Sequence, residues 1–523
     1  MNFFRQVDKD AFIVPAVVSV IVLLFGVLNP EGFGAVINVA FNWLSNNLGW
    51  VYQIGLFFLL AFCLWAGFSK VGRIRIGGKD AKPTMSMGSW IAITFTSGMA
   101  LGVVFYGVGE GLQNYMAPPG FSGMEAGSVE AAEHALRYVF FHWGLHPYAI
   151  YCGAGLAFAF IYWNAKRSFT LSSGLYPLLG EKGERGLPGK IVNWVCMYIM
   201  VATLGTNMGL ASLQLSAGIQ YVFHAEVPES ILGPVVIFVL AFCGILFACS
   251  GIHKAIKYVS LTNMYIFGIL VVFAFFFGGT RFIMNNTVTS IGKYLAYFLE
   301  ESFYMDPAPR LGGSTVDHYY WTWWLTVAPL TGLFLSKLAK GRTIRQFVLV
   351  NLFVPIGFII IWFGTFGSSA IFQQMNGGQI WQAIEEFGFP VALFAYLKEL
   401  PLTPFLMVLG FLAIFFSFTT QSESMTYTMA GMTSADKSED ESGEQRSPVY
   451  LKIFWGAAIA LFGYALLLSG GLDQVQRSVV MLGLPVLAIL IVNAVGFIKA
   501  VTHREIYDLT LTEEEKKKLI EER

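Results

Sequence analysis

The stretch Tyr319-Tyr320-Trp321-Thr322-Trp323-Trp324-Leu325-Thr326-Val327-Ala328-Pro329 places three tryptophans within four residues. Lys337 is the one charged residue between Tyr319 and Leu338, so this segment is long and apolar enough to cross a bilayer. Successive helical residues point about 100° apart, so the three indoles cannot all lie at a lipid interface. We expect at least one to face inward, where an aromatic face attracts cations. The alternative is an aromatic belt at the membrane surface.

Composition places the chain among polytopic membrane proteins. Of its 523 residues, 55% are hydrophobic and 13% are charged, which is more apolar surface than one soluble core needs. The formal net charge is zero, so there is no basic field for nucleic acid and we expect no such partner. The five cysteines contain no CxxC pair and are typical of small buried hydrophobic residues.

Twelve apolar segments approach the ~20 residues that a membrane-spanning helix needs. They lie at 12–29, 50–68, 88–107, 140–163, 191–221, 231–250, 259–278, 318–338, 347–367, 404–430, 451–470 and 478–501. Lysine and arginine gather in the even-numbered loops, for example at 70–82 and 337–345. The positive-inside rule therefore predicts that both termini are cytoplasmic in a multi-pass protein of the cell (inner) membrane. Segments 289–303 and 371–398 have the pattern of amphipathic surface helices.

Two of these segments are interrupted, and they stand five spans apart. Gly98 and Gly102 permit close packing or local unwinding in the third segment, and Pro329 and Gly332 interrupt the eighth. Because these two segments run in opposite directions, the pattern predicts two inverted five-helix repeats, segments 3–7 and 8–12. The predicted division is 1–87 for two leading helices, 88–278 for one repeat, 279–317 for an outer amphipathic helix, 318–503 for the other repeat and 504–523 for a cytoplasmic tail.

Polar residues within spans point to candidate sites. His142 and His146 have the i, i+4 spacing of a zinc pair, but the carboxylates of a metalloprotease are missing and Pro147 disturbs the helix. Threonine and serine oxygens near Thr419 and Thr420 suit a hard cation such as sodium. They could equally bond their own helix backbone. A second polar island contains Thr203, Thr206 and Asn207.

Five motifs occur in order, and together they resemble the betaine/carnitine/choline transporter family. They are Gly98-Met99-Ala100-Leu101-Gly102, Phe105-Tyr106-Gly107-Val108-Gly109-Glu110, His142-Trp143-Gly144-Leu145-His146-Pro147, Tyr320-Trp321-Thr322-Trp323-Trp324 and Gly341-Arg342-Thr343-Ile344-Arg345. The resemblance implies an all-α, LeuT-like fold of twelve transmembrane helices, assembled as a homotrimer. It also implies secondary active transport of quaternary ammonium compounds (glycine betaine, carnitine, choline or a related betaine) by alternating access.

The same resemblance assigns site residues. An aromatic box would comprise Trp143, Tyr148, Tyr151, Trp321, Trp323 and Trp324. The glycine stretch, with Gly98, Met99, Ala100 and Gly102, would lie against the substrate and offer backbone amides to a carboxylate. A sodium site would use Met99, Thr419 and Thr420. Apart from sodium as a coupling ion, no cofactor is expected.

The chain also departs from the family pattern. Family members often have an aromatic residue where this chain has Val327, so one wall of the box differs. Aligned back from Tyr427, the adjacent hydroxyls of sodium-coupled members fall on Thr420 and Gln421, which loses one hydroxyl. Aligned one residue earlier, Thr419 and Thr420 restore the pair. Sodium symport and substrate/product antiport therefore both remain open.

Two other functions fit parts of the sequence. A sodium-coupled amino-acid carrier of the same fold would not need clustered tryptophans. A membrane-embedded enzyme would use His142 and His146. The chain has no Gly-rich phosphate loop followed by Lys-Ser/Thr, which argues against an ATPase.

Overall fold

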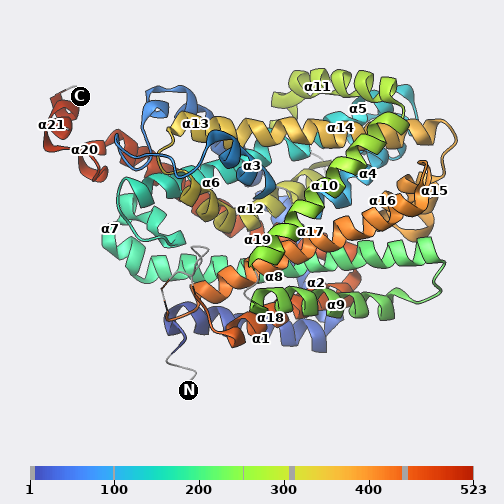
Figure 1. The fold of residues 1–523 in the computed structure, drawn as a ribbon, viewed down its shortest axis with the longest axis horizontal. Helices are drawn as coiled ribbons and strands as arrows, with labels where there is room; N and C mark the ends of the chain where they lie inside the picture. The colour runs from blue at the N-terminus through green and yellow to red at the C-terminus, as the bar shows by residue number, and fades with distance from the viewer. Residues whose placement is uncertain are drawn as a thin grey trace.

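The computed structural model describes residues 6–97, 101–250, 253–305, 313–436, 438 and 446–521. These residues form helices joined by turns, and the β-structure among them is limited to two isolated bridges (Figure 1). The prediction of an all-α membrane protein is confirmed.

The helices that position the site cover most of the chain. Their bounds are α1 Lys9–Leu28, α2 Pro30–Phe68, α3 Met87–Ser97, α4 Leu101–Met116, α5 Val129–Trp143, α6 Leu145–Trp163, α7 Tyr176–Arg185, α8 Leu187–Phe223, α9 Glu229–Ser250, α10 His253–Phe277, α11 Thr280–Phe303, α12 Gly313–Leu338, α13 Ile344–Val348, α14 Val354–Met375, α15 Ile380–Phe387, α16 Ala392–Lys398, α17 Thr403–Met432, α18 Val449–Gly470 and α19 Leu472–Thr502. Two short helices, α20 Arg504–Tyr507 and α21 Glu513–Glu521, follow at the carboxyl end.

Ten helical segments of the described chain are long and apolar enough to cross a membrane, and they match ten of the twelve predicted spans. The other two predicted spans are the interrupted ones. Segment 88–107 is divided between α3 and α4, on either side of residues 98–100, which lie outside the described residues. Segment 318–338 is α12, whose tryptophans, threonines and proline lower its hydropathy. The count of twelve and the inverted repeats stay predictions.

Three predicted segments differ from the structure in their extent. Segment 140–163 is a span, as predicted, but the span covers Val129–Trp163 and is interrupted at the non-helical Gly144, where α5 ends and α6 follows. Segment 289–303 is the second half of the longer α11. Segment 371–398 holds the end of α14 and the short helices α15 and α16, separated by glycines such as Gly388, whose φ of 81° ends a helix.

The described start of the chain and several even-numbered loops pair with one another through backbone contacts, and α7, α13, α20 and α21 lie toward the left in Figure 1. Val7 pairs with Ser434, and Arg75 pairs with Thr343. In the carboxyl-terminal tail, the Leu509 amide donates to the Asn164 carbonyl over 2.9 Å. These contacts join the segments to one another, and their location on the cytoplasmic side of the membrane stays a prediction.

The Gly-Arg-Thr-Ile-Arg motif after α12 holds this end together. Arg342 donates to the Met85 carbonyl over 2.6 Å, and Arg345 donates to the Gly67 carbonyl over 3.0 Å. Gly341 has a φ of 76°, and a β-carbon there would lie 2.4 Å from the backbone carbon of Lys82. Only glycine fits such a position without strain.

Candidate functional site

All three tryptophans of α12 are buried, with exposed fractions of 0% for Trp321 and 5% each for Trp323 and Trp324. This excludes the aromatic belt and confirms that at least one indole faces inward. Three neighbouring indoles can all be buried because α12 is surrounded by α2, α5, α6, α8 and α19. Trp323 and Trp324 both pack against Trp143, whereas Trp321 packs against Phe141 and His146.

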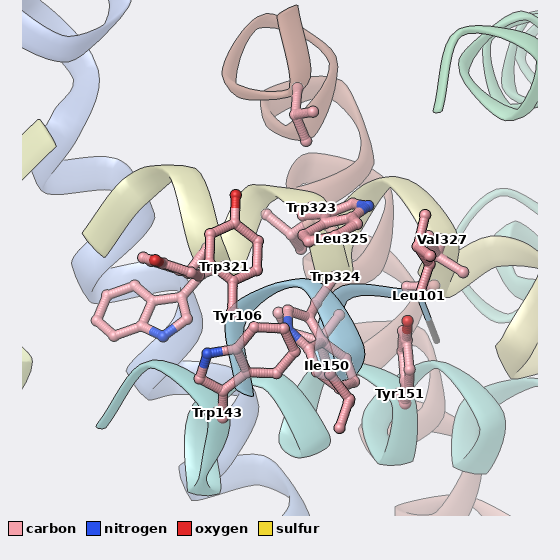
Figure 2. Packing of buried hydrophobic residues seen from close by; sticks show 14 of the residues in the cluster. Leu101, Tyr106, Trp143, Ile150, Tyr151, Trp321, Trp323, Trp324, Leu325 and Val327 are labelled. Atoms are coloured by element: carbon pink, nitrogen blue, oxygen red, sulfur yellow. The ribbon is translucent and has the colours of Figure 1, made fainter. Parts of the chain in front are cut away.

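One small cavity lies between these helices. It has a volume of about 20 Å³ and is lined by Gly102, Val103, Trp143, Tyr151, Asn207, Trp323, Trp324, Val327 and Gln421. The lining comes from α4, α5, α6, α8, α12 and α17, so segments more than 300 residues apart meet here. In Figure 2 the side chains of Trp143, Trp323 and Trp324 lie near one another, and Tyr151 and Val327 lie on their right.

The aromatic rings of the cavity pack edge to face. The Trp143 ring centroid lies 5.8 Å from that of Trp324, at an interplanar angle of 78°, and 6.4 Å from that of Trp323. The Tyr151 centroid lies 4.7 Å from that of Trp324. Tilted rings at these distances are a stable aromatic arrangement, and they present several ring faces to one space.

Gly102 permits this close packing. A β-carbon at Gly102 would lie 2.6 Å from Cη2 of Trp323 and 2.9 Å from Cη2 of Trp143. Any larger residue would push one of the two rings away. Gly98, Met99 and Ala100, the other predicted members of this stretch, lie outside the described residues.

A buried carboxylate holds the Trp143 ring from behind. The indole nitrogen donates to Oε2 of Glu110 over 2.7 Å, and Oε1 lies 2.6 Å from Nδ1 of His142. Glu110 is 2% exposed. An acid in a spanning region is costly unless it is paired, and here both oxygens have partners.

A pair of amides holds the Trp323 ring. The indole nitrogen donates to Oδ1 of Asn207 over 2.8 Å, and Nδ2 of Asn207 donates to Oε1 of Gln421 over 3.1 Å. Both amides also line the cavity. The sequence marked Asn207 only as part of a polar island and Gln421 only as a departure from the family, and it did not join them.

Two predicted box residues lie outside the cavity lining. Trp321 stacks on His146 at 4.9 Å and packs against Phe141 at 5.1 Å, away from the other two indoles (Figure 2). Tyr148 contacts the Trp324 ring at 4.9 Å from behind the lining. Helical geometry explains this, because Trp321 points to a different side of α12 from its neighbours.

Of the predicted sodium ligands, Thr419 and Thr420 do not belong to the cavity lining, and Met99 lies outside the described residues. The Thr419 hydroxyl donates to the Phe415 carbonyl of its own helix over 2.7 Å, as the alternative proposed. The Thr420 hydroxyl is buried and has no hydrogen-bond partner among the described residues. His142 pairs with Glu110, whereas His146 stacks on Trp321, and the described residues hold no group of three metal-binding side chains.

Comparison with known proteins places this cavity in context. Residues 10–506 match the sequence model described as BCCT, betaine/carnitine/choline family transporter. A probable glycine betaine transporter of Desulfitobacterium hafniense is 34% identical, covering 94% of this chain and 98% of that protein. The osmo-independent choline transporter BetT1 of Acinetobacter baylyi is 32% identical, covering 86% and 85%. An ectoine/hydroxyectoine transporter of Virgibacillus pantothenticus is 31% identical, covering 95% and 97%.

Proposed function

This chain belongs to the betaine/carnitine/choline family of transporters, and from that membership and its aromatic cavity we propose that it carries quaternary ammonium compounds by secondary active transport. It is a multi-pass membrane transporter, not an enzyme. The observation that carries the proposal is the group formed by Trp143, Trp323, Trp324 and Tyr151 around one cavity.

A trimethylammonium group suits such a cavity. It has no N–H to donate, so hydrogen-bond acceptors cannot hold it. Aromatic faces attract its charge, at roughly 0.5–2 kcal/mol for each ring. A small hydrated cation would lose more hydration free energy on entering the same apolar space. Glycine betaine, carnitine, choline and related betaines are therefore the proposed substrate class.

Substrate binding requires the rings to move. A cavity of about 20 Å³ has room for about one water molecule, which is less than a trimethylammonium group needs. Because α12 contributes Trp323 and Trp324 while α5 and α6 contribute Trp143 and Tyr151, a relative shift of these helices would open the cavity. Such a shift fits alternating access between two inverted repeats, which we propose for this chain.

For the coupling mode we propose sodium symport or substrate/product antiport. The buried hydroxyl of Thr420, which lacks a partner among the described residues, supports a sodium ligand. The amide of Gln421 beside it supports the loss of one ligand and hence sodium-independent exchange. We also propose that the carrier is a homotrimer of the cell inner membrane with cytoplasmic termini, as the resemblance and the loop charges indicate.

Uptake into proteoliposomes tests these proposals. Labelled glycine betaine and carnitine would be supplied outside, with and without a sodium gradient, and with unlabelled substrate loaded inside. Uptake that needs the gradient identifies a symporter, and uptake that needs only internal substrate identifies an antiporter. In a symporter, Thr420→Ala should reduce the stimulation of uptake by sodium. Thr428→Ala is the control and should leave that stimulation unchanged, because the Thr428 hydroxyl donates to the Ser424 carbonyl of its own helix on an exposed face. Uptake of no quaternary ammonium compound under any of these conditions would overturn the proposed function.

A further inference from the structure

The hydrogen bonds behind Trp323 run in one direction. An indole nitrogen can only donate, so the Asn207 atom 2.8 Å from it must be the amide oxygen. This fixes which way the Asn207 amide points, and its nitrogen faces Gln421. The Gln421 atom 3.1 Å away is therefore the accepting oxygen.

The side-chain nitrogen of Gln421 is consequently the last group in this series of hydrogen bonds. Gln421 lines the cavity, and its Nε2 donates to no atom of the described residues. The two N–H groups are thus left beside the aromatic rings. A ligand that met them would have to offer a hydrogen-bond acceptor.

The cavity also carries no formal charge of its own. No Asp, Glu, Lys or Arg belongs to its described lining, and residues 98–100 are Gly, Met and Ala. The carboxylate of Glu110 lies behind Trp143, where both of its oxygens are engaged. A cation bound here would bring an unbalanced charge into an apolar site, which is costly. A zwitterion brings its own counter-charge.

We propose that Gln421 is a specificity residue, whose amide N–H groups donate to the carboxylate of a zwitterionic substrate. Together with the neutral lining, this makes the carrier prefer a quaternary ammonium zwitterion such as glycine betaine over the cation choline. The inference rests on the proposed function and assigns the anionic end of the substrate to the α8–α17 side of the cavity.

Equilibrium binding to the full-length protein in nanodiscs tests the preference. The probes are glycine betaine, choline and tetramethylammonium, which share the cationic head and differ in the rest. Glycine betaine should bind about 10-fold or more tightly than either cation, because a hydrogen bond to a charged group is at the strong end of the range. Equal affinities for all three probes would overturn the inference.

The variant Gln421→Glu tests the residue itself. One carboxylate oxygen can still accept from Asn207, while the other replaces the N–H donors with a negative charge. Affinity for glycine betaine should fall about 10-fold, and affinity for choline should rise. Gln382→Glu makes the same chemical change on the exposed surface of α15 and should alter neither affinity.

A second variant covers a failure of Gln421→Glu to fold. In Asn207→Asp, the side chain still accepts from Trp323 but can no longer donate to Gln421, so the Gln421 amide is free to turn. The preference for glycine betaine should then narrow to less than about 3-fold. If either variant lowers the affinities for glycine betaine and choline equally, the proposed specificity role of Gln421 is wrong, although the proposed transport of quaternary ammonium compounds is unaffected. If the wild-type protein binds none of the three probes, the proposed function itself fails.

Discussion

Trp143 and Glu110 are joined by a hydrogen bond of 2.7 Å between the indole nitrogen and a carboxylate oxygen that lies outside the cavity lining. The acid sits behind the ring, and so it sets the position of an aromatic face without contacting what that face binds. Glu110 is thereby a positioning residue in the proposed site.

Two replacements of Glu110 should distinguish its role in holding the Trp143 ring from the effect of its negative charge. In Glu110→Gln, the side-chain oxygen can accept from Trp143 while its nitrogen donates to the neutral form of His142, so substrate affinity should change less than about 3-fold. In Glu110→Ala, the Trp143 nitrogen loses its acceptor and the ring is released, so affinity should fall about 10-fold. The measurement is substrate binding to each purified variant, compared at equal folded concentration. Equal losses in both variants would mean that the charge, not the position, matters.

The two tryptophans at 321 and 323 should respond differently to truncation. Trp323→Ala removes a cavity ring and takes away the donor to the Asn207 oxygen, so affinity should fall at least about 10-fold, or about 1.4 kcal/mol. Trp321→Ala leaves the cavity lining intact but empties a core position, which typically costs about 3–5 kcal/mol of stability. We therefore expect a lower melting temperature with unchanged affinity in the folded fraction. Substrate titration and thermal unfolding distinguish the two outcomes, and unchanged affinity in Trp323→Ala would contradict the aromatic cavity.

Gly102→Ala should disturb the site although it adds a single methyl group. The new carbon would lie 2.6 Å from the Trp323 ring, so that ring must move and substrate affinity should fall severalfold. Gly88→Ala on α3 is the matched control, because a β-carbon there meets nothing within 4 Å. Binding titrations of both variants check the prediction, and similar affinities in the two would show that the rings adapt freely.

The close packing of Gly341 against Lys82 should contribute to the thermal stability of the protein. Gly341→Ala combines a left-handed backbone with a contact of 2.4 Å to Lys82, and we expect a clear drop in melting temperature. Gly377→Ala has a similar φ of 92° but an open surrounding, so it should show only the smaller backbone cost. Thermal unfolding in detergent measures both, and the difference between them isolates the loop contact.

Much of the architecture follows from the sequence because the signals are long-range averages. A run of about twenty apolar residues indicates a segment that crosses lipid. The alternation of charge between loops indicates which side of the membrane each loop faces. Neither signal depends on how individual side chains pack. The tryptophan stretch likewise predicted an inward-facing ring, because one helix cannot aim three neighbouring side chains at the same surface.

The cavity itself could be predicted only in part. Trp321 and Trp323 belong to the same stretch of sequence, and only the packing of α12 against its neighbouring helices separates the ring in the core from the ring in the cavity. The link from Trp323 through Asn207 to Gln421 joins residues 116 and 214 positions apart. No local pattern encodes such a pairing, since it arises when α8, α12 and α17 meet.

The polarity of α12 has a consequence for how the chain enters the membrane. The described part of α12 is not apolar enough to span a membrane by composition alone, because its tryptophans, threonines and proline lower its hydropathy. A translocon that sorts segments by hydrophobicity would release it into lipid reluctantly. Its insertion should therefore depend on contact with α6, which is synthesised earlier and is already in the membrane. The carboxyl-terminal half of the protein would then need the amino-terminal half in order to insert.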